Sequence, residues 1–178
     1  LKATRKLYAG QDNPWLSPKK YLQLYGITAP IKWGNHHKSH FAAGYYTRPF
    51  EDAATLVVDA IGEWTTTSIW DNDTKIWSQI YPNSLGLFYS AFTARVGLKP
   101  NEDEYILMGM AAYGDPDRFH SDVYKVLKSK ENLHRGIPSW KPELTEEDYF
   151  DVAAAVQKVY ETELHTLLWI TKQHTLKK

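Results

Sequence analysis

The sequence predicts an α/β fold in which a sheet is flanked by helices, and three observations lead to this prediction. A short β-branched run at 55–58 is typical of a buried strand. Two β-rich runs at 62–70 and 74–81 are separated by a polar turn, which predicts a hairpin. Apolar residues then recur at helical spacing, first after residue 84 and again after residue 149.

The first 30 residues are polar, and prolines and a glycine break them into short pieces. Ser17 before Pro18 is typical of an N-cap and first position, so we expect a short helix at 19–24. A brief strand at 31–33 is expected to lead to Asn35, which would cap a helix that carries the first histidines.

The later helices are indicated by their ends. Asn83 or Ser84 is expected to cap a helix with an apolar core stripe, which Gly97 ends. Thr145 with Asp148 resembles a capping box at the start of the last and longest helix.

The chain between these two helices is rich in small residues and polar loops. Gly109, Ala111 and Ala112 predict that two backbone segments pack closely there. A further helix is expected at 118–130.

Three of the seven histidines, His36, His37 and His40, fall within five residues. On a helix, His36 and His40 lie one turn apart on the same face, while His37 points about 100° away. Two imidazoles in that relation can share one metal ion. No metalloprotease is implied, because His37 occupies the place of the glutamate in the H-E-x-x-H motif. The alternative is a histidine-rich helix end with ordinary hydrogen-bonded rings.

An acidic residue, Asp59, follows the predicted strand at 55–58, where open α/β sheets place their sites. In the turn beyond it, Gly62 would allow close backbone approach, and the hydroxyls of Thr65 and Thr66 could donate to phosphate or substrate oxygens. The alternative explanation is that threonines simply favour strands.

Composition limits the classes of function. The chain has 178 residues of which 43% are hydrophobic, so it can bury a core. Basic and acidic residues both number 21, so no net field attracts nucleic acid or an anionic membrane. Without cysteine, any metal must be held by histidine, carboxylate or water. With no long apolar run we expect no membrane contact and a cytoplasmic protein.

From about Trp33 to Leu168 the chain resembles the O-carbamoyltransferases of the nodulation-factor and antibiotic-tailoring type. The blocks that carry the resemblance occur in the order found in that family: His36-His37-x-x-His40, Leu56-Val57-Val58-Asp59, Gly62-Glu63-Trp64-Thr65-Thr66, the stretch Pro82-Asn83-Ser84-Leu85-Gly86-Leu87-Phe88-Tyr89, Glu104-Tyr105, Met108-Gly109-Met110-Ala111-Ala112-Tyr113-Gly114, and the start of the long helix at Asp151.

The resemblance implies an actin-like, ribonuclease-H-like α/β fold with a mixed sheet. The range 31–178 would be the central part of that domain and 1–30 a polar segment of it. In such enzymes a separate C-terminal domain makes carbamoyl-adenylate from ATP and carbamoyl phosphate. The actin-like domain then passes the carbamoyl group to a hydroxyl of a small sugar- or antibiotic-like acceptor, using a divalent metal. Iron is expected, with manganese or zinc as alternatives.

The resemblance also implies roles for particular residues. By position, His36, His40 and Asp59 resemble metal ligands, and Asp59 and Asp151 are the candidate catalytic carboxylates. The remaining candidates are Gly62, Thr65 and Thr66 for cofactor binding, and His37 and Tyr89 for the substrate. Ile106 stands where the family usually has lysine. Because other parts of the mechanism lie outside this sequence, we expect no turnover by this chain alone.

Two further functions are compatible with the sequence. The first is a metal-dependent phosphohydrolase that uses the His36 and His40 pair. The second is a non-catalytic module of the same fold that binds a partner or sugar through its aromatic residues. A sugar kinase of this fold is less favoured, because such kinases place no histidine pair before the strand that leads to Asp59.

Overall fold

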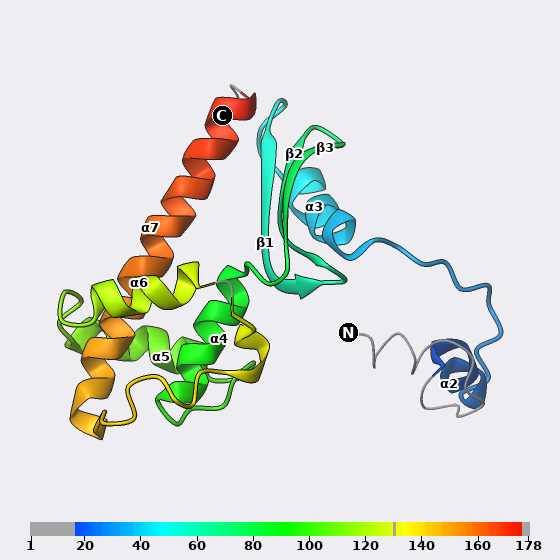
Figure 1. Cartoon of the computed structure of the whole chain (residues 1–178). Coiled ribbons are helices and arrows are strands. Elements are labelled where there is room, and N and C mark those ends of the chain that lie inside the picture. Colours follow the sequence, from blue (N-terminus) through cyan, green and yellow to red (C-terminus); the bar gives the residue numbers. More distant parts are fainter. Residues whose placement is uncertain (1–16, 130, 176–178) are drawn as a thin grey trace. The chain divides into compact units, whose positions relative to one another are not determined.

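The computed structural model describes residues 17–129 and 131–175, and the chain divides into two compact units between Asn35 and His36. The second unit carries one sheet and most of the helices (Figure 1). In chain order the elements are α2 (Pro18–Leu24), α3 (His36–Tyr46), β1 (Ala54–Gly62), β2 (Thr65–Asp71), β3 (Thr74–Ile80), α4 (Leu85–Arg95), α5 (Glu104–Met110), α6 (His120–Lys128) and α7 (Tyr149–Thr175), with short 3₁₀ turns η2 (Ala111–Tyr113), η3 (Leu133–Arg135) and η4 (Glu146–Asp148).

The first unit contains α2, and its start is as predicted. The Ser17 side chain accepts a hydrogen bond from the Lys20 backbone N–H, and Pro18 takes the first helical position. The strand expected at 31–33 is wrong, because this segment joins no ladder and Trp33 is 77% exposed. The assignment of 1–30 to the same domain stays a prediction, and residues 1–16 lie outside the described part of the chain.

The sheet has the order β1-β2-β3 and both pairings are antiparallel. The expectation of a mixed sheet is therefore wrong for the described residues. The reason is local, since turns of only two residues join β1 to β2 and β2 to β3, and such short turns reverse the chain. The hairpin predicted at 62–81 is confirmed as β2 and β3, although Gly62 belongs to β1 and the first strand of the hairpin begins at Thr65.

The buried strand is β2 rather than β1. Residues 66–70 of β2 are all buried, because the strand is paired on both sides and covered on its faces. In contrast, β1 is at the edge of the described sheet and most of it is only half-buried, with Val57 and Gly62 as its buried positions. The run at 55–58 was correctly predicted as a strand, but its burial was overestimated.

Helix α3 packs against the sheet through an aromatic stack. The Phe41 ring lies 4.6 Å from Trp70 and 5.0 Å from Tyr45, with the planes 22° and 26° apart, and Val57 completes the cluster. Figure 1 shows α3 and the C-terminal half of α7 on opposite sides of the sheet. This stack fixes the position of the helix that carries the three histidines.

The larger core lies among the helices α4 to α7. Ser84 caps α4 by accepting from the Leu87 N–H, and Phe88 and Phe92 are fully buried. Gly97, with φ +82°, follows the end of the helix as predicted. The capping box of Thr145 and Asp148 is confirmed, although it opens η4, from which α7 continues.

Close backbone packing occurs in the predicted region but at a different glycine. Gly109 has open space where a Cβ would lie, so its assignment to a tight contact is wrong. At Gly114 a Cβ would lie 2.0 Å from the Phe150 carbonyl oxygen, so η2 and the start of α7 touch backbone to backbone. The pattern of small residues indicated the contact without locating it.

Candidate metal centre

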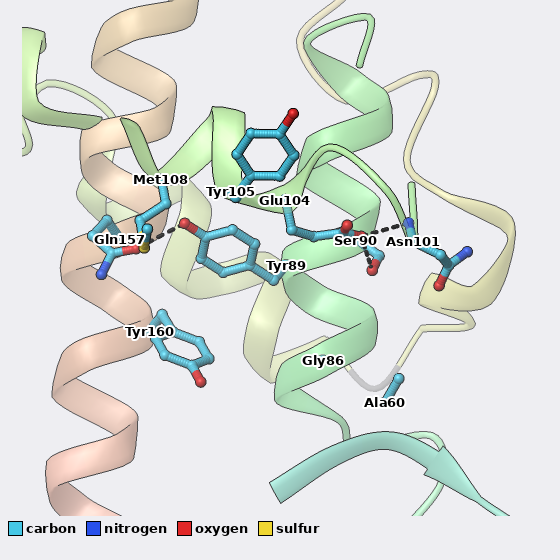
Figure 2. Close-up of a pocket in the computed structure, with 10 residues that line it drawn as sticks. All are labelled: Ala60, Gly86, Tyr89, Ser90, Asn101, Glu104, Tyr105, Met108, Gln157 and Tyr160. Atoms are coloured by element: carbon cyan, nitrogen blue, oxygen red, sulfur yellow. Dashed lines mark hydrogen bonds between the residues drawn. The ribbon is translucent and has the colours of Figure 1, made fainter. Parts of the chain in front are cut away.

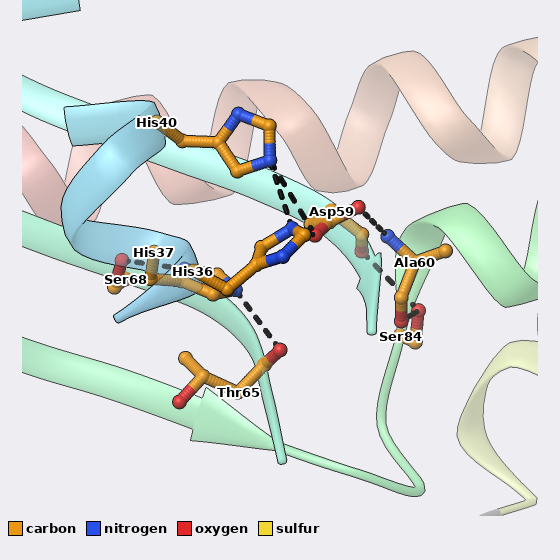
Figure 3. Close-up of polar contacts among 8 residues, drawn as sticks. All are labelled: His36, His37, His40, Asp59, Ala60, Thr65, Ser68 and Ser84. Carbon is orange, nitrogen blue, oxygen red and sulfur yellow. Dashed lines mark hydrogen bonds and ion pairs between the residues drawn. The ribbon is translucent and has the colours of Figure 1, made fainter. Parts of the chain in front are cut away.

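Two histidines of α3 point toward one place beside β1 (Figure 3). The Nε2 atoms of His36 and His40 are 2.9 Å apart, and their ring centroids are 4.7 Å apart. The side chains are 46% and 53% exposed, so the outer side of the pair is open to solvent. The relation predicted from their spacing of four residues is therefore present.

Asp59 completes the group from β1. Its Oδ2 lies 2.7 Å from His36 Nε2 and 3.7 Å from His40 Nε2. The expected position at the end of a strand is wrong, since β1 runs on to Gly62. Asp59 instead lies in the irregular stretch between Val58 and Gly62, where the register with β2 shifts. Such irregular stretches redirect side chains, and here the carboxylate faces α3.

The carboxylate of Asp59 is oriented but incompletely satisfied. Oδ1 accepts a hydrogen bond of 2.7 Å from the Ala60 backbone N–H. Oδ2 is buried and has no hydrogen-bond partner among the described residues, although the Nε2 atoms of His36 and His40 lie 2.7 and 3.7 Å from it. A buried carboxylate oxygen without a partner costs free energy, so this atom is suited to a cation.

The distances fit a single ion. Ligand atoms about 2.1 Å from a metal are about 3.0 Å apart in adjacent octahedral positions and about 3.4 Å apart in a tetrahedron. The three separations here, 2.7, 2.9 and 3.7 Å, scatter around those values. His36, His40 and Asp59 can therefore hold one divalent cation from one side and leave its other positions open.

His37 lies on the sheet side of α3 and is 1% exposed. Its Nδ1 is 2.8 Å from Ser68 Oγ and its Nε2 is 2.9 Å from the Thr65 carbonyl oxygen. Burial lowers the pKa of this imidazole below its usual range, so it stays neutral near pH 7. Both ring nitrogens are engaged within the protein, which fits the ordinary hydrogen-bonded histidine kept as an alternative; its role as a substrate contact stays a prediction.

The turn after β1 supports the histidines. A Cβ on Gly62 would lie 2.4 Å from His36 Cδ2 and 2.8 Å from His37 Cδ2, so both rings rest against this glycine. Thr66 is buried and its hydroxyl donates to the Asn83 carbonyl oxygen, while Thr65 offers its carbonyl oxygen to His37. The predicted role of these three residues in cofactor binding is not tested by this geometry.

Asp151 does not join the group. Its Oδ2 is 2.8 Å from Arg118 Nη1, and its Oδ1 accepts from the Asp115 backbone N–H. The hydrogen bond from Arg118, followed by that from Asp115, lowers the pKa of Asp151. This carboxylate is ionised, and Arg118 and the Asp115 N–H bind it at the start of α7. Its position gives no support to its predicted catalytic role.

Tyr89 lines a cavity of about 510 Å³ between α4, α5 and α7 (Figure 2). Its hydroxyl donates to Gln157 Oε1 at 2.7 Å, and burial raises the pKa of Tyr89 to about 12. Tyr160 and Glu104 also line the cavity, as does Ala60, whose N–H donates to Asp59. One residue that lines the cavity, Ala60, is therefore the sequence neighbour of Asp59 in the candidate metal centre.

Sequence reasoning missed Ser68 and Trp70, which connect His37 to the sheet. The Trp70 indole N–H donates to Ser68 Oγ at 2.8 Å. The two residues are two apart in β2, so their side chains share one face of the strand, and this period was visible in the sequence. Nothing in the sequence indicated that His37 would lie over that face.

The fold and the site together define the protein as a mixed α/β domain with a candidate metal centre, in which two imidazoles and a carboxylate converge beside the sheet. The chain also matches the family described as carbamoyltransferase N-terminus over residues 20–173. It therefore belongs to the carbamoyltransferase N-terminus family, as the resemblance predicted.

Three longer proteins are similar to parts of the chain. The uncharacterized protein sll1178 of Synechocystis is 47% identical over a stretch that covers 57% of this chain and 19% of that protein. The uncharacterized protein MJ1058 of Methanocaldococcus jannaschii is 31% identical over 61% of this chain and 20% of its own length. The nodulation protein NolO of Bradyrhizobium diazoefficiens is 32% identical over 53% of this chain and 18% of its own length. The chain thus matches these relatives over about a fifth of their length. Among the described residues no helix has both the length and the apolar character required to cross a membrane.

Proposed function

We propose that this chain is the metal-holding part of an O-carbamoyltransferase, with His36, His40 and Asp59 as ligands. The observation that carries the proposal is the buried Oδ2 of Asp59, which has no hydrogen-bond partner among the described residues and lies within 3.7 Å of both imidazole Nε2 atoms. Membership of the carbamoyltransferase N-terminus family supplies the reaction class. In this proposal the domain is one half-site of an actin-like, ribonuclease-H-like fold.

The ligand set favours iron. Two histidines and one carboxylate on one side of an ion, with open positions opposite, are typical of non-haem iron(II) sites. Nitrogen and oxygen ligands without sulfur are also compatible with manganese and zinc. When bound, the cation supplies positive charge that stabilises the negative charge that develops on the carbamoyl oxygen.

The residues of the chain then have separate roles in transfer. The acceptor oxygen forms a bond to the carbamoyl carbon, the bond from that carbon to the adenylate phosphate oxygen breaks, and AMP leaves. Asp59 is the proposed base, because Oδ1 is oriented by the Ala60 N–H and keeps a second lone pair for the hydroxyl proton. Gly62, Thr65 and Thr66 stay candidates for the adenylate, while Asp151 is left out of the mechanism because Arg118 occupies it.

The acceptor is proposed to enter the cavity lined by Tyr89. A cavity of about 510 Å³ matches a small sugar-like molecule, and tyrosine rings together with a carboxylate suit a polyhydroxylated ring. Ala60 connects this cavity to Asp59. The adenylate itself, made from ATP and carbamoyl phosphate, would come from a separate C-terminal domain of the larger protein, as in the family.

Binding of a carbamoyl-adenylate mimic tests the proposal. 5′-O-Sulfamoyladenosine would be titrated calorimetrically into the 178-residue chain with and without one equivalent of iron(II) under anaerobic conditions. We expect binding that requires the metal and weakens at least about tenfold in Asp59→Asn. Asp73→Asn removes an exposed carboxylate from the turn between β2 and β3 and serves as the matched control. Metal-bound protein with no affinity for the mimic would contradict the proposal.

A metal-dependent phosphohydrolase is the second candidate, and the open outer side of His36 and His40 favours it. Such a site could hold an activated water in place of the acceptor. Hydrolysis of p-nitrophenyl phosphate by the metal-loaded chain, lost in Asp59→Asn, would replace the first proposal. The described residues offer no fourth metal-binding side chain at the site to assist that chemistry.

A further inference from the structure

A hydrogen-bond relay runs from β2 to the histidine helix behind the candidate metal centre. The Trp70 indole N–H donates to Ser68 Oγ at 2.8 Å, Ser68 Oγ lies 2.8 Å from His37 Nδ1, and His37 Nε2 lies 2.9 Å from the Thr65 carbonyl oxygen. All three side chains are buried. The relay therefore joins α3 to the sheet at two points of one ring.

The Thr65 carbonyl oxygen fixes the proton on Nε2 of His37, and burial of the ring favours the neutral form, in which Nδ1 carries none. A carbonyl oxygen only accepts, so Nε2 of His37 carries the proton and donates to Thr65. In the neutral ring Nδ1 is then an acceptor, and the Ser68 hydroxyl donates to it. An indole N–H only donates, so Ser68 accepts from Trp70 with a lone pair that it does not otherwise need. Each donor of the relay then has one acceptor within it.

The relay holds α3 by its buried face. His37 lies between the two ligand histidines in sequence, and with Phe41 it forms the buried face of the helix. Side-chain ends lie about 5–6 Å from a helix axis, so a rotation of about 20° would move them by about 2 Å. Metal ligands tolerate errors of only about 0.2 Å, so a small rotation would separate His36 and His40 from Asp59.

Gly62 limits how closely α3 can approach the turn after β1. The rings of His36 and His37 already lie where a Cβ on Gly62 would be, at 2.4 and 2.8 Å, so α3 cannot approach this turn more closely. The hydrogen bonds of His37 prevent it from moving away. Contact on one side and hydrogen bonds on the other define one position for the helix.

We propose that His37 is a positioning residue, whose hydrogen bonds to Ser68 and Thr65 set the rotation of α3 so that His36 and His40 converge on Asp59. The inference rests on the proposed function in one respect only, namely that the three converging side chains bind a divalent cation. His37 itself does not contact that cation, because both of its nitrogens are engaged elsewhere.

Ser68→Ala tests the proposal without changing α3. It removes the hydroxyl that holds Nδ1, and Thr67→Val is the matched control, because Thr67 is a neighbouring buried residue whose hydroxyl has no hydrogen-bond partner among the described residues. Cobalt(II) is the probe, because its visible spectrum reports ligand geometry. We expect Ser68→Ala to weaken cobalt binding about 10–100-fold and to alter the spectrum, while Thr67→Val changes neither. Equal behaviour of the two variants would overturn the proposal.

Two NMR measurements separate this proposal from the metal site itself. In the metal-free 178-residue chain, long-range proton–nitrogen spectra should show His37 as the Nε2–H tautomer. The contact between the His36 ring and the backbone of Gly62, whose Cβ position lies 2.4 Å from His36 Cδ2, should give a cross-peak that is lost in Ser68→Ala and kept in Thr67→Val. An Nδ1–H tautomer, or an unchanged cross-peak in Ser68→Ala, would overturn the positioning role. Absence of cobalt binding by the unsubstituted chain, with both NMR results as expected, would contradict the metal site alone.

Discussion

At the scale of single residues, Gly62 shows how a correct expectation can have a different physical basis. The sequence predicted close backbone approach at this glycine, with a cofactor as the approaching group. In the structure the rings of His36 and His37 make that approach. A missing side chain is visible in a sequence, whereas the identity of the neighbour depends on how α3 packs against the sheet.

Gly62→Ala is expected to destabilise the fold by about 1–3 kcal/mol, because the new Cβ would lie 2.4 Å from His36 and overpack the contact. Gly109→Ala is the matched control, since nothing lies within 4 Å of the place that its new Cβ would take, and alanine favours helices by up to about 1 kcal/mol. Urea unfolding of the two variants measures both effects. Similar stability changes in the two variants would contradict the close contact at Gly62.

At the scale of elements, Ser84 connects the helical core to the strand that carries Asp59. Its hydroxyl accepts from the Leu87 N–H as the N-cap of α4 and donates to the Ala60 carbonyl oxygen of β1. The side chain is buried, so water cannot replace it. The cap was predictable from the sequence, but the link to β1 was not, because it joins residues 24 positions apart.

Ser84→Ala is expected to cost about 1–2 kcal/mol of folding free energy, from the lost cap and from the lost hydrogen bond to the half-buried Ala60 carbonyl. Ser78→Ala changes an exposed serine of β3 and should stay within about 0.5 kcal/mol of the unsubstituted chain. Thermal or urea unfolding measures the difference. A loss at Ser84 no larger than that at Ser78 would show that the cap and its link to β1 are unimportant.

The start of α7 is joined to the segment between η2 and α6 by Arg118, which contacts Asp148 Oδ1 at 2.5 Å and Asp151 Oδ2 at 2.8 Å. The pKa of Asp148 is lowered first by the Thr145 backbone N–H, then by the Thr145 hydroxyl and by Arg118. The pKa of Asp151 is lowered first by Arg118. Folded-state carboxyl pKa values below the unfolded ones mean that their stabilisation is complete above the usual aspartate pKa of about 3.9 and is lost as the pH falls through the lowered values.

Arg118→Gln should therefore be less stable than the unsubstituted chain at pH 5–7, and the difference should shrink as the pH falls below about 4. Urea unfolding at a series of pH values checks this dependence. Lys172→Gln, an exposed change near the end of α7, controls for the loss of one positive charge. A stability difference that is independent of pH down to pH 2 would contradict the assigned role of Arg118.

At the scale of the whole molecule, local patterns predicted the elements well, and their assembly less well. The hairpin, the capped helix after Ser84 and the capping box at Thr145 depend on neighbours in sequence, and all were predicted. The direction of strand pairing followed from turn length, which the mixed-sheet expectation overlooked. The segment at 31–33 has strand-like residues but pairs with no strand in the described part of the chain, and a strand requires a partner.

The candidate metal centre was predictable in part for the same reason. The relation of His36 to His40 is set within one helix turn, so their spacing was sufficient. The position of Asp59 depends on an irregularity in β1, and that of His37 on two residues of β2, which no local pattern encodes. The contact of Asp151 with Arg118 was not predictable either, because the two residues lie 33 positions apart in the sequence.

The metal content of the protein tests the central claim most directly. The 178-residue chain, purified without oxygen and offered iron(II), manganese(II) and zinc(II), would be analysed by mass spectrometry beside His40→Ala and His165→Ala. His165 is an exposed histidine of α7 and provides the matched loss of one imidazole. We expect about one equivalent of metal in the unsubstituted chain and in His165→Ala, and almost none in His40→Ala. A folded chain without metal, or equal metal in the two variants, would contradict the account.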